Sequence, residues 1–305
     1  MQRTGDENHF GYPVDEKNGF QVIECEACGF RHVYPLPDPE DLRAIYSEDY
    51  YSKEKPLYIE QYTEDVEWWR LTYAARLALI EKHVSPDGHT LLDIGSGPGY
   101  FLESATARGW DAHGVEPSTQ AFRFASDLGV SVEQGLFDSE TAHRFQGMDV
   151  VHLCNVLEHL PDPTTTVSLI HEILSEGGLI MVIVPNDYNP IQNALREHQG
   201  FSPWWVTPPH HLNYFSFSSL EQLLIRRGFR IVERSCSFPI DLFLMMGDNY
   251  VGNDLVGRSV HKKRKRLEIE LARAGLEGMQ SKIYRHFAEL GIGREIIVIA
   301  QKCEV

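Results

Sequence analysis

A glycine-rich turn between a strand and a helix constrains this chain more than any other feature. Residues 91–102 read LLDIGSGPGYFL, so an apolar run ends at Ile94 and three glycines precede a second apolar run. Glycine permits positive φ and lets a ligand approach the main chain closely. A helix N-terminus beyond the turn offers N–H groups that have no partner within the helix. The pattern predicts a ligand site where a buried strand, residues 90–94, meets a helix that runs to residue 108.

Strand and helix patterns alternate through most of the chain. We expect strands at 90–94, 112–115, 130–133, 148–153, 178–184, 229–233 and 295–300, and helices at 58–84, 118–128, 163–175 and 220–227. Repeated strand–helix units predict an α/β fold with a mostly parallel sheet. We expect residues 1–60 to form an N-terminal cap of irregular structure with short elements. We expect residues 61–240 together with 292–305 to form the core, and residues 241–291 to form a helical insertion that shapes the substrate pocket.

The residues around the turn indicate which ligand it holds. A dinucleotide fingerprint needs a third glycine where Tyr100 stands. Asp93 lies just before the turn, where a carboxylate suits an amine or a positive charge. Glu116 ends the next strand about 20 residues on, where an acid accepts bonds from ribose hydroxyls. These features suit a nucleoside with a cationic, zwitterionic tail, such as S-adenosylmethionine.

Several segments resemble those of a known family. Residues 91–102 and Gly114-Val115-Glu116-Pro117-Ser118 are similar to the first two motifs of class I S-adenosylmethionine-dependent methyltransferases. Residues 155–163, NVLEHLPDP, resemble the fourth-strand motif of the ubiquinone O-methyltransferase-like branch, and 184–186 and 211–216 continue the likeness. The resemblance implies a Rossmann-like sheet of seven strands with an antiparallel last strand, and S-adenosylmethionine as the cofactor. With the reasoning above, it gives these cofactor-binding residues: Asp93, Gly95, Ser96, Gly97, Gly99, Tyr100, Glu116, Pro117, Gly135, Leu136, Phe137, Cys154 and Asn155.

Three histidines are candidate catalytic bases. A base is needed if the methyl acceptor is a hydroxyl or an acidic C–H, and neutral histidine suits this role. His159 follows the fourth strand, and the resemblance places it near the sulfonium. His210 and His211 belong to the long loop after the fifth strand. For all three, a purely structural role in a loop is the alternative. The ubiquinone branch can bind a metal through an acid where Asn155 stands here, so we expect no catalytic metal.

The two ends of the chain are less informative. Cys25-Glu26-Ala27-Cys28 resembles the second half of a zinc ribbon found in front of sugar C-methyltransferases. A structural zinc site needs four ligands, and the only other nearby donors are His9 and His32, so we expect a degenerate, metal-free remnant. The basic run 261–266 is either a solvated helix face or a phosphate clamp. Trp204 and Trp205 either pack within a lid or stack on the acceptor.

Composition limits the partners. Lys plus Arg number 28 and Asp plus Glu 44, so the net charge is −16. This charge disfavours nucleic acid and anionic membranes as partners. Five scattered cysteines suit the reducing cytoplasm. We therefore expect a cytoplasmic O-methyltransferase whose acceptor is a small molecule: a sugar, a nucleotide-sugar or another secondary metabolite. An RNA or protein methyltransferase and a non-catalytic cofactor-binding scaffold are the alternatives, and the oligomeric state, a homodimer included, stays open.

Overall fold

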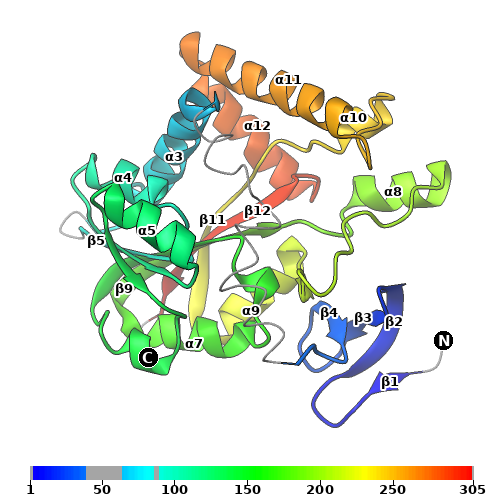
Figure 1. Cartoon of the computed structure of the whole chain (residues 1–305), viewed down its shortest axis with the longest axis horizontal. Helices are drawn as coiled ribbons and strands as arrows, with labels where there is room; N and C mark the ends of the chain where they lie inside the picture. Colours follow the sequence, from blue (N-terminus) through cyan, green and yellow to red (C-terminus); the bar gives the residue numbers. More distant parts are fainter. Residues whose placement is uncertain (1–2, 39–63, 86–88, 304–305) are drawn as a thin grey trace. The chain divides into compact units, whose positions relative to one another are not determined.

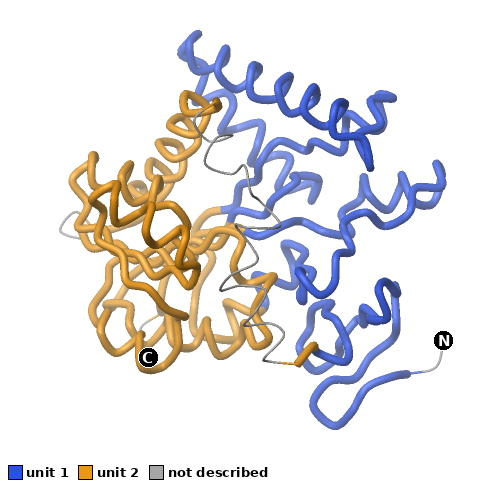
Figure 2. The backbone as a smooth tube through the Cα atoms, in the orientation of Figure 1, with its two compact units in different colours: residues 1–36, 184–222, 234–297 blue, residues 37–183, 223–233, 298–305 orange. Residues whose placement is uncertain are grey.

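The computed structural model describes residues 3–38, 64–85 and 89–303. The chain divides into two compact units (Figure 2). The first unit comprises residues 1–36, 184–222 and 234–297, and the second comprises 37–183, 223–233 and 298–305. Each unit is built from three separate stretches of the chain. The division into cap, core and insertion that we expect from the sequence follows other boundaries and stays a prediction.

A seven-stranded sheet has the order β11-β12-β9-β8-β5-β6-β7. The pairs that β5 forms with β6 and β8, and those of β6 with β7 and β8 with β9, are parallel. The sheet is antiparallel at its end, which confirms the predicted Rossmann-like fold. Its strands are β5 (Thr90–Ile94), β6 (Asp111–Glu116), β7 (Ser131–Gln134), β8 (Met148–Cys154), β9 (Leu174–Pro185), β11 (Phe229–Cys236) and β12 (Glu295–Lys302).

The central strands are apolar because both faces of the sheet are covered. Leu91, Val151 and Ile180 are fully buried in neighbouring strands, as expected for strands of a parallel sheet. The register aligns Asp93 of β5 with Gly114 of β6 and with His152 of β8. The carboxyl ends of these strands therefore lie at one edge of the sheet, where ligands of such folds bind.

Helices connect the strands at the predicted places (Figure 1). They are α3 (Val66–Ile80), α4 (Tyr100–Thr106), α5 (Thr119–Asp127), α7 (Pro163–Ile173) and α9 (Phe217–Arg226). The short helix α6 (Ser139–Ala142) was not predicted. Side-chain caps fix several of their beginnings: Ser118 accepts from the main-chain N–H of Ala121, and Asp162 accepts from that of Thr165. The predicted helix at 58–84 is described only from residue 64, and residues 58–63 lie outside the described chain.

The N-terminal region differs from the expectation of irregular structure. β1 (Thr4–Gly5), β2 (Phe10–Lys17), β3 (Phe20–Cys25), β4 (Arg31–Tyr34) and β10 (Asn213–Tyr214) form an antiparallel five-stranded sheet. Asn18 and Gly19 join β2 to β3 and both have positive φ. An Asn-Gly pair is a strong signal for a two-residue hairpin turn, and Pro13 at a register shift obscures the alternation that would have shown the strand.

Helices also fill the region before the last strand. α10 (Leu242–Met245), α11 (Asp254–Arg273) and α12 (Glu277–Glu289) confirm the predicted helical character. The sequence analysis missed α8 (Pro190–Gln199), which Asn189 caps by accepting hydrogen bonds from the N–H groups of Ile191 and Gln192. Among the described helices, none combines the length and the apolar character that a membrane crossing requires.

Candidate cofactor site

The glycine turn is held against the end of β6 by main-chain hydrogen bonds. Gly95 N and Ser96 N both donate to Val115 O, at 2.8 and 3.2 Å. Gly99 has a φ of 83° at the start of α4, a value that L side chains rarely adopt. A Cβ atom at Gly99 would also lie 2.7 Å from Val130 Cγ2. The sequence LDIGSGPG thus folds into a turn in which any side chain at position 99 is unfavourable.

Glu116 is buried at the end of β6 and directly contacts this turn. Its Oε2 atom accepts a hydrogen bond from Gly97 N at 2.8 Å, and its Oε1 atom accepts one from Ser118 N at 2.8 Å. Burial raises the pKa of Glu116 to about 7, although the two N–H donors act in the opposite direction. A carboxyl group placed here can accept ribose hydroxyls, and its protonation state changes near neutral pH.

Asp93 has a partner that the sequence analysis missed. His152 Nδ1 lies 2.7 Å from Asp93 Oδ1, and both side chains are buried. The imidazole stacks on Phe101 of α4, with 4.0 Å between the ring centroids. A polar residue inside the apolar run of β8 is the signal that could have revealed this pair, because buried polar groups need hydrogen-bonding partners.

The other predicted cofactor residues lie at the same edge of the sheet. Tyr100 begins α4 and packs edge-on against Phe124. Pro117 follows β6, and Gly135, Leu136 and Phe137 follow β7. Gly135 N donates to Glu116 O at 3.1 Å, which ties the third strand end to the second.

The end of β8 completes this arrangement. Asn155 has a φ of 55°, an unusual value for a residue other than glycine, and its N–H donates to Ile183 O. Cys154 Sγ accepts a hydrogen bond from Arg76 Nη1 at 3.4 Å. Arg76 is a second residue that the sequence analysis missed; it is a buried cation on the otherwise apolar face of α3. The positive φ of Asn155 strains the backbone, and strained backbone is typical of functional sites.

These residues fit the predicted cofactor. The Ser96 Oγ atom is buried and has no hydrogen-bond partner among the described residues. The turn therefore contains a hydroxyl group whose hydrogen-bonding capacity is unused. Leu136 is half exposed and offers an apolar surface next to the end of β7. All thirteen predicted cofactor residues belong to the second compact unit, and the site can be described without reference to the first.

The three candidate bases are divided between the two units. His159 ends a short 3-10 helix, η2 (Leu157–His159), and its Nε2 atom lies 3.7 Å from Oε1 of buried Glu158. His210 and His211 belong to the first unit. Their main-chain N–H groups donate to Thr207 O at 3.0 and 3.1 Å. In the second unit, a histidine–carboxylate pair therefore follows the same strand as Asn155.

Two features outside this site have structural partners. Trp205 is buried and packs edge-on against Tyr188, with 5.4 Å between the ring centroids, as in the packing interpretation. The basic run lies on α11, where Arg264 is buried and Lys263 Nζ pairs with Asp248 at 2.7 Å. At least part of the basic run therefore serves the packing and charge balance of the first unit.

Comparisons with known proteins identify the family of the chain. A family model described as a methyltransferase domain matches residues 62–234. Two proteins named ubiquinone biosynthesis O-methyltransferase, from Paraburkholderia xenovorans and Paraburkholderia phymatum, are 35% and 32% identical over 111 residues. Each match covers 34% of this chain and 48% of the relative, so the chain spans about half the length of these curated relatives.

A solved structure shares the fold. It is the complex between the Haloferax volcanii Trm112 methyltransferase activator and a methyltransferase. The TM-score is 0.51 at 16% identity, and the match covers 82% of this chain and 94% of the other. A likeness at this identity concerns the fold alone.

Proposed function

The chain belongs to the methyltransferase-domain family and is an S-adenosylmethionine-dependent methyltransferase, and from this premise we propose that it methylates an oxygen atom of a small molecule, with His159 as the base. The observation that carries the proposal is the pairing of His159 with buried Glu158 directly after β8. This strand ends at Cys154, and Asn155 follows it; both are predicted cofactor contacts.

The cofactor would be held by side chains and main-chain groups at the carboxyl ends of β5, β6 and β8. Asp93 would face the amino group of the methionine part, and Glu116 would accept hydrogen bonds from the ribose hydroxyls. When bound, S-adenosylmethionine supplies a methyl group activated by a positively charged sulfur. Much of the rate of such a one-step displacement comes from holding the acceptor in line with that methyl group.

His159 would take the proton that the acceptor loses. Its Nε2 atom faces Glu158 at 3.7 Å, so we assign Nδ1 as the atom that accepts the proton. The resulting imidazolium would be stabilised by the nearby carboxylate, because an opposite charge at this distance favours the charged form. His210 and His211 are the alternative bases, and no metal is required for this proton transfer.

A small acceptor suits the charge of the chain and the names of its relatives. A net charge of −16 opposes the binding of RNA. Two curated relatives are named as O-methyltransferases of ubiquinone biosynthesis. That likeness covers about half of each relative, so the oxygen acceptor is part of our proposal, as is the cytoplasm as the place of reaction.

An acceptor screen followed by variant kinetics tests the proposal. Mass spectrometry of the purified chain with S-adenosylmethionine and a panel of hydroxylated sugars, nucleotide-sugars and phenols should detect a product that has gained one methylene. Protein and RNA substrates belong in the same panel, and methylation of these alone would contradict the small-molecule assignment.

The variants separate the candidate bases. His159→Ala should lower kcat by about 10²–10⁴-fold, the usual contribution of a general base, while the cofactor Kd stays nearly unchanged. His210→Ala and His211→Ala are the parallel tests of the alternatives, and His143→Ala, at an exposed position after α6, is the matched control. A full-rate His159→Ala enzyme would refute the role of His159.

A further inference from the structure

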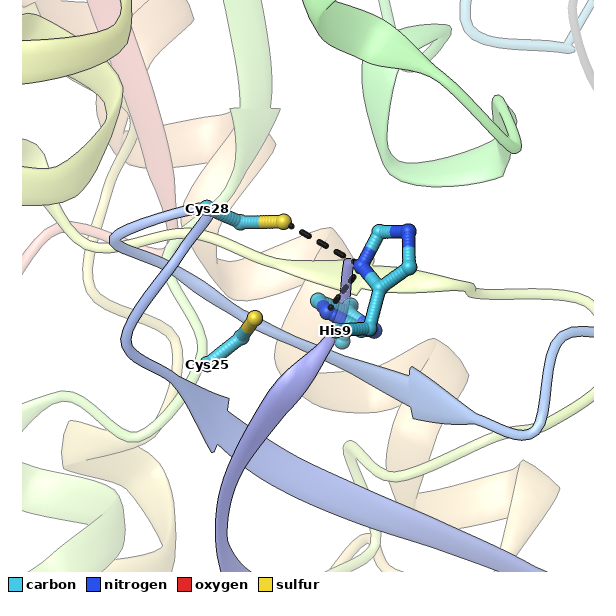
Figure 3. Close-up of side chains that lie close together, drawn as sticks. His9, Cys25 and Cys28 are labelled. Atoms are coloured by element: carbon cyan, nitrogen blue, oxygen red, sulfur yellow. Dashed lines mark hydrogen bonds between the residues drawn. The ribbon is translucent and has the colours of Figure 1, made fainter. Parts of the chain in front are cut away.

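Four side chains that can bind a metal converge at one end of the small N-terminal sheet. They are His9, which precedes β2, Cys25 at the end of β3, Cys28 in the following turn, and His32 on β4. One ligand atom from each residue lies within 4.8 Å of all the others. Figure 3 shows the side chains of Cys25, Cys28 and His9 pointing toward one common point.

The local backbone explains why the two thiols share one side. Gly29 N donates to Cys25 O at 2.9 Å, and Cys25 N donates to Phe30 O at 3.3 Å. These bonds close a tight turn between β3 and β4, in which Gly29 has a φ of 78°. The turn therefore brings Cys25 and Cys28 to one side, and C-x-x-C is a usual spacing for two cysteines that bind the same zinc ion.

A second turn fixes His9. Asp6 Oδ1 accepts hydrogen bonds from Asn8 N and His9 N, both at 2.8 Å, and Asp6 N donates to His9 O at 2.8 Å. The main chain that carries the imidazole is therefore held in place before β2 begins. This geometry brings a histidine from one hairpin end to the cysteine pair of another.

The distances agree with a tetrahedral zinc site. His9 Nδ1 lies 3.2 Å from His32 Nε2 and 3.4 Å from Cys28 Sγ. With Zn–N bonds of about 2.0–2.1 Å and Zn–S bonds of about 2.3 Å, the edges of a tetrahedron are about 3.4 Å for N–N and about 3.6 Å for N–S. The two observed separations are about 0.2 Å shorter than these edges, so small side-chain movements would accommodate the ion at these ligands.

A chain of hydrogen bonds explains the same contacts less well. A ring nitrogen directs one lone pair or one proton in the plane of the ring, yet His9 Nδ1 faces both Cys28 Sγ and His32 Nε2. His32 Nδ1 lies 2.8 Å from Val33 O, so it donates there and leaves Nε2 with its lone pair. Metal-binding histidines are usually oriented in this way, by a hydrogen bond from the other ring nitrogen to a carbonyl.

We propose that His9, Cys25, Cys28 and His32 bind a structural zinc ion. Two sulfur and two nitrogen ligands are a usual set for tetrahedral zinc. On binding, both thiols lose a proton to solvent, and the two resulting thiolates balance the charge of the ion. The proposal replaces the metal-free remnant expected from the sequence, because the fold supplies the two missing ligands from β4 and from the turn before β2.

The proposed ion would also support the segment that carries two of the candidate bases. His32 of β4 lies opposite Asn213 of β10, and Val33 N donates to Leu212 O at 2.8 Å. Leu212 directly follows His211. A ligand of the ion is therefore on the strand to which this segment is hydrogen-bonded, and loss of the ion should loosen residues 212–214.

Elemental analysis of the full-length chain tests the proposal without substrate or cofactor, so its outcome is independent of the proposed methyl transfer. The protein is purified in the presence of a thiol reductant and without added metal, and its metals are measured by inductively coupled plasma mass spectrometry. We expect about one zinc ion per chain. Cys25→Ser, Cys28→Ser and His32→Ala should each lose most of it, whereas Cys303→Ser, at an exposed cysteine, should retain it.

Two measurements on the unmodified chain keep the test independent of variant folding. Cobalt should replace zinc and give the visible absorption of a tetrahedral site with thiolate ligands. Chelation should accelerate hydrogen exchange in residues 31–34 and 212–214 but not in β5. Purified wild-type protein without stoichiometric metal, a disulfide between Cys25 and Cys28, or iron in place of zinc would each overturn the proposal.

Discussion

His152 Nδ1 lies 2.7 Å from Asp93 Oδ1, and this buried pair joins β8 to β5 at the edge where the cofactor residues gather. Asp93 therefore takes part in two interactions. Its carboxylate accepts a hydrogen bond from within the sheet, and in our assignment it also faces the amino group of the cofactor. Stacking on Phe101 restricts the imidazole, so the orientation of Asp93 depends on His152.

Replacing Asp93 should therefore weaken cofactor binding, because both the contact with the amino group and the hydrogen bond with His152 change. We expect Asp93→Asn to raise the Kd of S-adenosylmethionine at least about tenfold, because a hydrogen bond to a charged group contributes about 1.5–3 kcal/mol. His152→Gln should raise it less, and should add little in the Asp93→Asn background. Isothermal titration of both single variants and the double variant measures the coupling. Strictly additive effects would show that His152 does not orient Asp93.

Glu116 predicts a pH dependence of cofactor binding. Burial raises the pKa of Glu116 from 4.5 to about 7, so the carboxylate that ribose hydroxyls require is incompletely formed at pH 6. The affinity for S-adenosylmethionine should increase as the pH rises from 6 to 8. Titration of Glu116→Gln in the same buffers provides the control, because this variant should bind weakly and lack that component of the pH dependence.

The same group affects stability with a definite sign. Between pH 4.5 and about 7 the folded chain holds the Glu116 proton while the unfolded chain has lost it. The free energy of unfolding contributed by this group therefore decreases as the pH rises through that window, by about 3 kcal/mol at most, and is constant above it. Glu116→Gln should remove this component, and identical pH–stability curves for wild type and variant would contradict the assignment.

Local patterns allowed much of the fold to be predicted. The strand from 90 to 94, the glycine turn and Glu116 follow from apolar runs and glycine spacing within short windows. The Asp93–His152 pair joins residues 59 apart in the sequence, so only the strand register brings it together. Arg76 of α3 reaches Cys154 across 78 residues, a tertiary contact that no local pattern specifies.

The N-terminal sheet was missed for a different reason. Pro13 interrupts the pattern of β2 at a register shift, and β4 and β10 are only four and two residues long. The hairpin signal of Asn18 and Gly19 is local and was overlooked. His9 and His32 were visible as nearby donors, but only the antiparallel pairing of β2 with β3 and β3 with β4 places them beside Cys25 and Cys28.

A side chain at Gly99 should destabilise the folded chain, and the same substitution at Gly109 provides a matched control. Both have positive φ, 83° and 93°, so alanine costs about 1–2 kcal/mol of backbone strain at either position. At Gly99 the new Cβ would also meet Val130 Cγ2 at 2.7 Å and Ala125 Cβ at 3.0 Å, whereas at Gly109 nothing lies within 4 Å. Gly99→Ala should therefore lose an additional 1–3 kcal/mol, roughly the cost of overpacking.

Thermal unfolding and cofactor titration measure this difference. Gly99→Ala should have the lower Tm and should bind S-adenosylmethionine more weakly, because the turn must move away from Ala125 and Val130 to make room. Gly109→Ala should bind it as the wild type does. Equal Tm values for the two variants would show that contacts with Val130 and Ala125 do not limit the side chain at position 99.

Arg294 forms an ion pair with buried Asp187 in the first compact unit. Arg294 Nη1 donates to Asp187 Oδ1 at 2.9 Å, and the side chain of Asp187 is only 1% exposed. Arg294→Met would leave that carboxylate buried and unpaired, which typically costs about 3–5 kcal/mol. Arg273→Met breaks an exposed pair with Glu270 instead, and should cost less than about 1 kcal/mol. Similar losses in the two variants, measured by urea unfolding, would show that Arg294 does not compensate a buried charge.

The pH dependence of Arg294→Met separates a lost charge partner from lost packing. Burial raises the pKa of Asp187 above its ordinary value of 3.8 even beside Arg294, and removal of the guanidinium should raise it further in the folded chain. The folded chain then binds a proton at a pH where the unfolded chain does not. The variant should therefore regain stability as the pH falls toward 5, relative to the wild type. Asp187→Asn in the Arg294→Met background removes the charge, so it should recover stability at pH 7 and no longer respond to acid in this way. A purely steric defect would be insensitive to both changes.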